Sequence, residues 1–290
     1  MNQRQILEAA ADRLAAAGVQ EAAGDAWLMM SEAFSISRTD YYMHCDDECD
    51  CSGSEQYSLF ESMVDRRCRR EPLQYILGKS YFMGYEFKVT PDVLIPRFDT
   101  EILVEESLKY IKSGDRILDM CTGSGCIAVS VMLEWNRKQK SASEDTRIVV
   151  DAVDISDAAL AVARKNAAKL GAEQVNFISG DMFENTKGQY NVILSNPPYI
   201  PTEDIKELEP EVKDCEPVTA LDGTEDGLFF YRILAGESGK HLHSGGYLLM
   251  EIGYNQAEAV SLLLEENNFA DIKVVKDLAG LDRVVCGRRI

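Results

Sequence analysis

The chain has 290 residues, of which 46% are hydrophobic and 27% are charged, so it can build a sizeable core. This composition excludes intrinsic disorder and collagen-like repeats. The net charge is −19, whereas proteins that bind duplex DNA normally show a basic face, because phosphate contacts dominate their affinity. The eight cysteines follow no disulfide framework, and no apolar run reaches the roughly 18 residues of a membrane helix. We therefore expect a cytoplasmic protein with reduced thiols.

The first quarter of the chain, residues 1–75, predicts a small helical domain without a catalytic motif. Apolar residues recur at helical spacing near the N-terminus, and further helices are predicted over about residues 21–34 and 54–70. In the stretch from residue 72 to residue 98, aromatic and β-branched residues alternate with glycine and proline. This pattern favours a hairpin and extended chain, so we assign residues 76–100 to a hairpin linker.

The remaining part, residues 101–290, alternates predicted strands with predicted helices. This rhythm indicates an α/β fold with a mostly parallel sheet covered on both faces. The connection between the last two strands is too short for a crossover, so these strands should pair antiparallel. The strand candidates are residues 116–120, 148–153, 175–178, 190–195, 247–252, 272–275 and 283–286.

An acidic segment between predicted helices contains His44, Cys45, Cys49 and Cys51. Cysteine and histidine are zinc ligands, but structural zinc sites usually place their cysteines in closely paired motifs. The spacing here matches none of the usual pairs. We therefore expect an acidic loop and no metal, while the sequence alone leaves metal binding at these residues open.

A tight glycine loop follows the first strand of this α/β part and precedes a helix. Gly123 and Gly125 carry no side chain, so the backbone there can come close to a ligand. Together with Ala128 they also match the spacing of a dinucleotide site. By itself, the loop is also compatible with a purely structural turn.

Acidic residues follow the next two predicted strands. Asp154 ends one of them, where a carboxylate can accept both hydroxyls of a ribose, in NAD and in S-adenosylmethionine alike. After the other strand, Asp181 can accept the adenine amino group and Met182 can cover the ring. Because ligands of open α/β sheets bind at the carboxyl ends of strands, these residues and the glycine loop predict one cofactor site.

The strand over residues 190–195 runs directly into Asn196-Pro197-Pro198-Tyr199, the most specific motif of the chain. Two consecutive prolines make the turn rigid, and the Asn196 side chain and the Pro197 carbonyl offer two hydrogen-bond acceptors. Tyr199 adds a flat apolar face for a planar amide or base. Two acceptors can bind both hydrogens of an NH₂ group and aim its nitrogen at a sulfonium methyl group. We therefore expect Asn196, Pro197 and Tyr199 to be catalytic.

Three other functions are compatible with parts of the sequence. A nicotinamide-dependent enzyme is disfavoured because no histidine or lysine stands in an obvious context for hydride transfer. An N-methyltransferase acting on an exocyclic amino group of DNA or RNA would need a basic channel for the nucleic acid, and the net charge of −19 argues against such a channel. A non-catalytic adaptor that binds S-adenosylmethionine would not need the intact motif at residues 196–199.

The sequence resembles the HemK/PrmC family, the protein-(glutamine-N5) methyltransferases that modify peptide chain release factors. The resemblance runs from about Glu71 to the C-terminus, with a compatible helical domain before it. The Asn-Pro-Pro-Tyr motif is shared with adenine-N6 DNA and guanine-N2 RNA methyltransferases. The other motifs distinguish the HemK/PrmC family from these nucleic-acid methyltransferases. They are Pro72 to Gly78, Leu94 to Arg97, Asp99 to Glu101, Leu118 to Gly125, Ser195 to Ile200, Glu216-Pro217, Ala220-Leu221, Asp226 to Leu228, Glu251 to Gly253 and Asp277 to Arg283.

The resemblance implies a Rossmann-like class I methyltransferase domain with a seven-stranded, mostly parallel sheet whose last strands are antiparallel. It implies a helical bundle that helps to dock the release factor, joined to that domain by the β-hairpin linker. The cofactor would be S-adenosylmethionine, its product S-adenosylhomocysteine, and the substrate the glutamine of a Gly-Gly-Gln motif. We expect the cofactor to contact Cys121, Thr122, Gly123, Ser124, Gly125, Asp154, Asp181, Met182 and Asn196. We expect the substrate to contact Arg97, Asn196, Pro197, Pro198 and Tyr199, with Thr100 also over the site.

Two residues depart from the family pattern. Cys121 stands where glycine is usual, at the entrance of the glycine loop, and Phe98 stands where proline is usual, in a linker. Release factors are the expected partners, without direct contact to nucleic acid or membrane, and a monomer is the expected state. Which release factor is preferred is left open.

Overall fold

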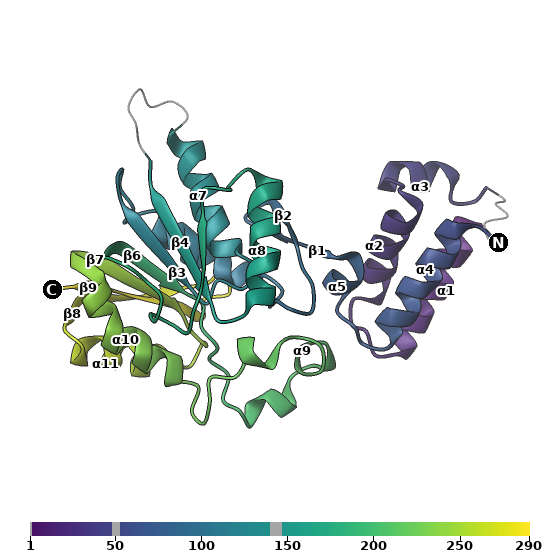
Figure 1. Cartoon of the computed structure of the whole chain (residues 1–290). Coiled ribbons are helices and arrows are strands. Elements are labelled where there is room, and N and C mark those ends of the chain that lie inside the picture. Colours follow the sequence, from purple (N-terminus) through teal and green to yellow (C-terminus); the bar gives the residue numbers. More distant parts are fainter. Residues whose placement is uncertain (1, 48–52, 140–146) are drawn as a thin grey trace. The chain divides into compact units, whose positions relative to one another are not determined.

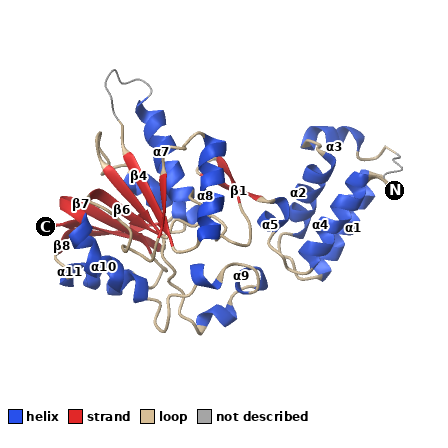
Figure 2. Cartoon of the chain, viewed as in Figure 1, coloured by secondary structure: helices blue, strands red, loops and turns tan. Residues whose placement is uncertain are grey.

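The computed structural model describes residues 2–47, 53–139 and 147–290, which form two compact units (Figures 1 and 2). The first comprises residues 1–78 together with 209–215, and the second comprises residues 79–208 and 216–290. The hairpin therefore belongs to the second unit. A short segment from late in the chain belongs to the first. The sequence pattern anticipates neither assignment, because both depend on tertiary contacts.

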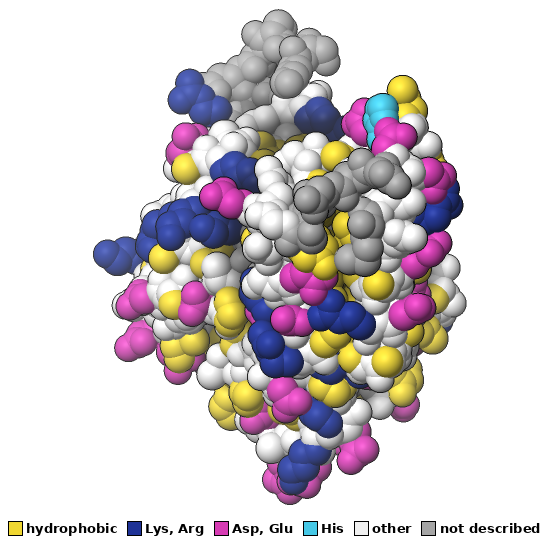
Figure 3. All heavy atoms as spheres, turned by 90° about the vertical axis from the view of Figure 1, so that its right-hand side faces the viewer, with side chains coloured by type: hydrophobic (Ala, Val, Ile, Leu, Met, Phe, Trp, Pro, Cys, Tyr) yellow, Lys and Arg dark blue, Asp and Glu magenta, His cyan; other side chains and the backbone are white. Residues whose placement is uncertain are grey.

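On the face drawn in Figure 3, acidic, basic and hydrophobic side chains lie intermixed. In the described ranges, no helix combines the length and the apolar character needed to cross a membrane.

The first unit is built from helices that share one apolar core. α1 begins in a capping box, in which the Asn2 side chain accepts from the Gln5 amide at 3.0 Å and the Gln5 side chain accepts from the Asn2 amide at 3.1 Å. Leu14, Met30 and Phe60 are fully buried between the helices. The helices are α1 (Gln3–Ala16), α2 (Ala22–Phe34), α3 (Arg38–His44), α4 (Glu55–Cys68), α5 (Leu73–Leu77) and α9 (Pro210–Lys213).

Three of these helices, α3, α5 and α9, were not predicted, and the expectation of extended chain is wrong for residues 73–77. In α5, Leu73, Tyr75 and Ile76 are buried, and Gly78 ends the helix in the left-handed conformation with φ +69°. A single turn of helix is too short to show a helical period in the sequence. Burial against the neighbouring helices stabilises it instead.

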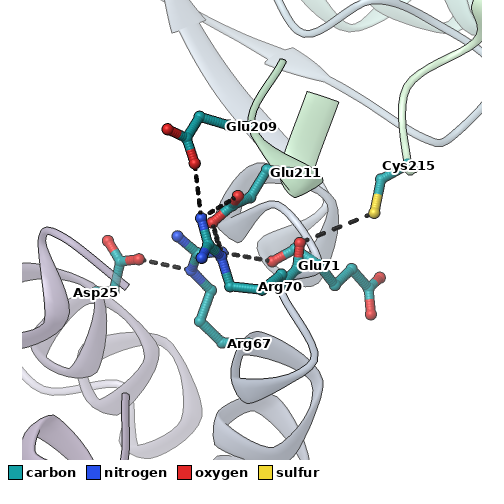
Figure 4. A network of polar contacts seen from close by, with 7 residues as sticks. All are labelled: Asp25, Arg67, Arg70, Glu71, Glu209, Glu211 and Cys215. Atoms are coloured by element: carbon teal, nitrogen blue, oxygen red, sulfur yellow. Dashed lines mark hydrogen bonds and ion pairs between the residues drawn. The ribbon is translucent and has the colours of Figure 1, made fainter. Parts of the chain in front are cut away.

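An arginine cluster holds α9 within the first unit (Figure 4). Arg70 binds both carboxylate oxygens of Glu211, through Nε and Nη2, each at 2.6 Å. Arg67 donates to Glu211 at 2.9 Å and to Asp25 of α2 at 2.7 Å. Burial raises the pKa of Glu211, but the hydrogen bonds from Arg70 and Arg67 outweigh it and hold the pKa to about 2. Glu211 is therefore ionised at neutral pH, and α9 is held by a paired, bidentate contact.

The second unit contains the hairpin of β1 (Lys79–Phe82) and β2 (Tyr85–Lys88) and a seven-stranded sheet of order β5-β4-β3-β6-β7-β9-β8. The five strands from β5 to β7 are parallel, and β9 runs antiparallel to both of its neighbours. This confirms the predicted fold class, including the antiparallel end. The strands are β3 (Arg116–Met120), β4 (Val149–Asp154), β5 (Asn176–Ser179), β6 (Tyr190–Ser195), β7 (Leu242–Glu251), β8 (Phe269–Lys276) and β9 (Asp282–Arg289).

Helices cover both faces of this sheet. Alternate residues of a strand point to opposite faces, so Ile117 packs with α6, α7 and α8 while Leu118 packs with α10 and α11. The helices are α6 (Glu101–Ser107), α7 (Cys126–Gln139), α8 (Asp157–Leu170), α10 (Phe229–His241) and α11 (Ala257–Glu266), with short 3₁₀ turns at Phe98–Thr100, Asp204–Glu207 and Val218–Ala220.

The strand order places a crevice at the centre of the sheet. From β3 the chain proceeds to β4 and β5 on one side and then returns to β6 and β7 on the other. Ligands of open α/β sheets bind at the carboxyl ends of the strands beside such a switch point. The glycine loop after β3 and the Asn196 motif after β6 both lie there.

Candidate active site

A cavity of about 390 Å³ opens at the carboxyl ends of β3, β4, β5 and β6. Its size suits a small-molecule cofactor. Seven of the predicted site residues line it: Cys121, Gly123, Asp154, Asp181, Met182, Asn196 and Pro198. The structure thus brings together residues that lie up to 77 positions apart in the sequence. Thr122, Ser124, Gly125, Pro197, Tyr199 and Arg97 are not part of the lining.

The two glycines of the loop serve different purposes. A side chain added at Gly123 would meet nothing within 4 Å and would extend into open space, as expected where a ligand approaches the backbone. At Gly125, an added Cβ would lie 3.0 Å from Ala163 Cβ and 3.4 Å from Phe177. Both glycines have a positive φ, +54° at Gly123 and +79° at Gly125. Gly125 is therefore required by the packing of the loop against α8.

A buried carboxylate, Asp119 of β3, fixes this loop. Its Oδ2 accepts from the Thr122 hydroxyl at 2.6 Å and from the Ala128 amide at 3.1 Å. Asp119 is fully buried, and burial raises its pKa to about 7. Thr122 thus shapes the loop from inside. Sequence reasoning missed Asp119, although its place at the end of a buried strand before the loop was visible.

Asp154 supports the loop from the neighbouring strand. Its Oδ2 accepts from the Gly123 amide at 2.8 Å and its Oδ1 accepts from the Ser156 amide at 2.9 Å. Burial raises the pKa of this carboxyl. Each carboxylate oxygen can accept more than one hydrogen bond, so Asp154 can still accept from hydroxyl groups in the cavity.

Two sulfur side chains form an apolar patch of the wall. The Cys121 Sγ lies 4.0 Å from the Met182 Sδ. Both residues adopt the left-handed conformation, with φ +63° and +47°. Burial raises the pKa of the Cys121 thiol, so it is neutral at physiological pH. The backbone at Cys121 keeps the shape that glycine adopts easily, although a side chain is present.

The lining is acidic at several points. Its charged residues are Asp92, Asp154, Asp181 and Asp222, and no lysine, arginine or histidine belongs to it among the residues that the structure describes. Hydrophobic side chains complete the wall, notably Phe229, Phe230 and the exposed Ile155, none of which was predicted from the sequence. The cavity therefore suits a ligand with positive charge and an apolar ring better than one with phosphates.

The motif after β6 is held rigidly. Pro197 and Pro198 are buried, and Asn196 is half-buried at the cavity wall. The Tyr199 carbonyl accepts from Gln256 Nε2 at 3.0 Å, and burial raises the pKa of the Tyr199 phenol to about 12. The Asn196 Nδ2 donates to the Thr100 hydroxyl at 3.2 Å. The turn thus presents a fixed amide at the edge of the cavity.

Arg97 lies outside the cavity lining and is paired. Its Nη2 contacts both oxygens of Glu216, at 2.7 and 2.8 Å, and the Glu216 side chain is almost fully buried. Phe98 next to it is 75% exposed and begins the short 3₁₀ turn that leads into α6. Binding of substrate by Arg97 would require the guanidinium to use donors that Glu216 leaves free.

The acidic segment near residue 44 is only partly described. Cys49 and Cys51 lie outside the described residues. His44 pairs with Asp47 at 2.9 Å, and Cys45 is buried at the end of α3. In residues 2–47, 53–139 and 147–290, no group of three or more potential ligands is arranged to hold a metal ion.

Comparison with known proteins agrees with this architecture. Residues 5–78 match the family described as the PrmC N-terminal domain, and residues 97–208 match the methyltransferase small domain. The release factor glutamine methyltransferase of Geobacter sulfurreducens is 40% identical over 286 residues, which cover 98% of this chain and 96% of the relative. The enzyme of that name from Cereibacter sphaeroides is 39% identical and covers 99% of each chain.

Among solved structures, a methyltransferase from Pyrococcus furiosus matches with a TM-score of 0.51 and 16% identity. The match covers 72% of this chain and 90% of that chain. At this identity the likeness concerns the fold alone.

Proposed function

The chain belongs to the release factor glutamine methyltransferase family, and we propose that it methylates the side-chain amide nitrogen of a glutamine in peptide chain release factors. The target would be the glutamine of the Gly-Gly-Gln motif. The observation that carries the proposal is the rigid Asn196-Pro197-Pro198-Tyr199 turn, whose Asn196 and Pro198 line an acidic and partly apolar cavity.

S-adenosylmethionine is the cofactor that these residues fit. When bound, it supplies an electrophilic methyl group on a positively charged sulfonium. The open space at Gly123 admits a ligand close to the backbone, and the acidic lining favours positive charge. Asp154 would accept from ribose hydroxyls, while Met182 and Ile155 would cover the adenine. A nicotinamide dinucleotide fits less well, because basic residues are absent from the described lining and its pyrophosphate would face carboxylates.

The substrate amide would be held by two acceptors. The Asn196 side-chain oxygen and the Pro197 carbonyl each accept one hydrogen of the NH₂ group, which turns the nitrogen lone pair toward the methyl group. Tyr199 offers its ring as a flat surface for the planar amide. A strong base is unnecessary, because the methylated nitrogen loses its extra proton readily. Catalysis is then mostly orientation.

The helical unit would contribute to release-factor docking. It carries no chemical motif, and its exposed apolar side chains include Leu28, Tyr42 and Met43. We infer that this unit recognises the folded factor, while the cavity recognises the glutamine. Release factors act in the cytoplasm, where we expect the protein to work as a monomer without direct contact to nucleic acid or membrane.

The decisive experiment is mass spectrometry of a purified release factor after incubation with the protein and S-adenosylmethionine. We expect a mass increase of one methyl group, about 14 Da, on the glutamine of the Gly-Gly-Gln motif. A factor in which this glutamine is replaced by alanine serves as the control and should gain no mass. Methylation at another residue, or calorimetric binding of NADH instead of S-adenosylmethionine, would contradict the proposal.

A further inference from the structure

The side-chain amide of Asn196 has a polar partner that does not belong to the cavity lining. Its Nδ2 donates to Thr100 Oγ1 at 3.2 Å. Thr100 is only 2% exposed and lies at the junction between the Phe98–Thr100 turn and α6. Because Nδ2 is directed to Thr100, the Asn196 Oδ1 occupies the other side of the amide, where it is available to a substrate.

A second buried group lies on the neighbouring strand. In the register of β6 and β7, Ser195 pairs with Met250, so Asn196 and Glu251 come next on adjacent parallel strands. Glu251 is 1% exposed, and its Oε2 has no hydrogen-bond partner within the described part of the chain. Burial raises the pKa of Glu251 to about 7, although a side-chain hydrogen bond with Thr100 and the positive charge of Arg283 both act to lower it.

The chemistry of these three groups sets the direction of their hydrogen bonds. With a pKa of about 7, a large fraction of Glu251 is ionised at neutral pH, and in this form it has no proton to donate, so it accepts the Thr100 hydroxyl proton. The Thr100 oxygen then has only lone pairs to offer, and its partner must be the NH₂ group of Asn196. If Thr100 instead donated to Asn196, the Asn196 carbonyl oxygen would point to Thr100 and its NH₂ group would point to the substrate. Two NH₂ groups would then face each other, and neither could accept a hydrogen bond from the other.

We propose that Thr100 and Glu251 are positioning residues that hold the Asn196 amide with its carbonyl oxygen toward the substrate amide. The inference rests on the proposed function, because it concerns the residue that would grip the glutamine. It gives Glu251, a buried carboxylate with one unpartnered oxygen in the described part of the chain, a role that acts only through Asn196. Such a role should affect turnover and leave the affinity for the cofactor unchanged.

The test measures kcat and KM for methyl transfer to a release factor, with calorimetric affinity for S-adenosylmethionine and the melting temperature as controls. We expect Thr100→Val, which keeps the shape and removes the hydroxyl, to lower kcat about tenfold with little change in KM. Thr100→Ser restores the hydroxyl and should recover most of the rate. Equal rates for wild type and Thr100→Val would overturn the inference.

A double-mutant cycle separates positioning from a structural effect. In an Asn196→Ala background, Thr100→Val and Glu251→Leu, which removes the acceptor for Thr100, should cause no further loss, because the amide that they orient is gone. A loss by the same factor in both backgrounds would overturn the inference. Should Thr100→Val fail to fold, Glu251→Leu in the two backgrounds decides the same question. A wild-type protein that transfers no methyl group would contradict the proposed function instead.

Discussion

Asn196 is the side chain on which the proposed chemistry depends most directly. It is half-buried at the cavity wall and its amide is held from behind by Thr100. Its carbonyl oxygen would bind the substrate NH₂ group more tightly in the transition state than in the ground state. A change at this residue should therefore appear in turnover.

We expect Asn196→Ala to lower the rate of methyl transfer by about 10²–10³, the usual effect of removing one aimed hydrogen bond from a developing charge. Asn196→Asp keeps an acceptor but loses the NH₂ group that donates to Thr100, so it should restore only part of the rate. The measurement is single-turnover transfer to a release factor at saturating cofactor. If Asn196→Ala transferred the methyl group at the wild-type rate, Asn196 would serve only to form the turn and would not hold the substrate amide.

Cys121 shows how a departure from the family pattern is accommodated. Its φ of +63° lies in the left-handed region, which disfavours residues with a Cβ by about 1–2 kcal/mol. Cys121→Gly removes this strain but increases the freedom of the unfolded chain, while Cys121→Ala keeps the strain. Both lose the contact with Met182. We expect the glycine variant to be up to about 1 kcal/mol more stable than the alanine variant in urea unfolding, and the reverse order would contradict a left-handed loop entrance.

Asp119 should make stability depend on pH. Burial raises its pKa to about 7 in the folded protein, against about 3.9 in an unfolded chain. Between these values the folded protein holds a proton that the unfolded chain has released. The contribution of Asp119 to stability is therefore fully present below about pH 4 and is lost as the pH rises through 7.

Asp119→Asn cannot titrate and keeps an acceptor for Thr122 and Ala128. We expect its unfolding free energy to decline less steeply from pH 4 to pH 7 than that of the wild type, by up to about 1.4 kcal/mol per pH unit. Urea unfolding at a series of pH values measures this difference. Parallel curves for the two proteins would show that Asp119 is ionised throughout the range.

At the scale of elements, α9 depends on a contact between distant parts of the chain. The helix is one turn long, and such a short helix has little stability of its own. Arg67 in the last turn of α4 and Arg70 just after the helix bind Glu211, whose side chain is 16% exposed. The ion pairs are thus shielded from water, and breaking them leaves charges without partners.

We expect Glu211→Ala to lower the unfolding free energy by about 1–3 kcal/mol and to increase hydrogen exchange in residues 209–215. Glu203 is the matched control, because it pairs with Lys206 at the surface with side chains 81% and 66% exposed. Glu203→Ala should change stability by less than about 0.5 kcal/mol. Unchanged exchange at residues 209–215 in Glu211→Ala would show that the arginine contacts do not hold α9.

At the scale of the whole molecule, chemistry and docking are assigned to different units. The cavity and the Asn196 motif lie in the second unit, while the first has no chemical motif but exposes Tyr42 and Met43, each 68% exposed. If the first unit docks the folded factor, changes there should matter only for an intact substrate. A short peptide that contains Gly-Gly-Gln needs the cavity alone.

The double variant Tyr42→Ser/Met43→Ser should raise KM for an intact release factor several-fold, because each exposed apolar side chain buried on binding contributes about 1–3 kcal/mol at most. Methylation of the peptide should stay at the wild-type level. Leu262→Ser, which changes an exposed residue of α11 in the second unit, is the control and should affect neither substrate. Equal KM values for the double variant and the wild type would exclude this surface from docking.

The sequence by itself determined the succession of the strands along the chain, the mostly parallel sheet with its antiparallel end, the glycine loop after β3 and the Asn-Pro-Pro-Tyr turn after β6. Each of these follows from neighbouring residues: hydrophobic period, connection length, the freedom of glycine and the rigidity of proline. The carboxyl ends of parallel strands meet at one edge of the sheet, so the place of the candidate site was also predictable.

Only the tertiary structure decided which residues act together around the site. The contact between Asn196 and Thr100 joins positions 96 apart, and that between Glu211 and Arg67 joins positions 144 apart. The packing role of Gly125 depends on Ala163 of α8, and the extended stretch expected at residues 73–77 became a helix. The physical reason is the same throughout: side-chain packing, burial and hydrogen-bond direction depend on partners that the chain brings together only when it folds.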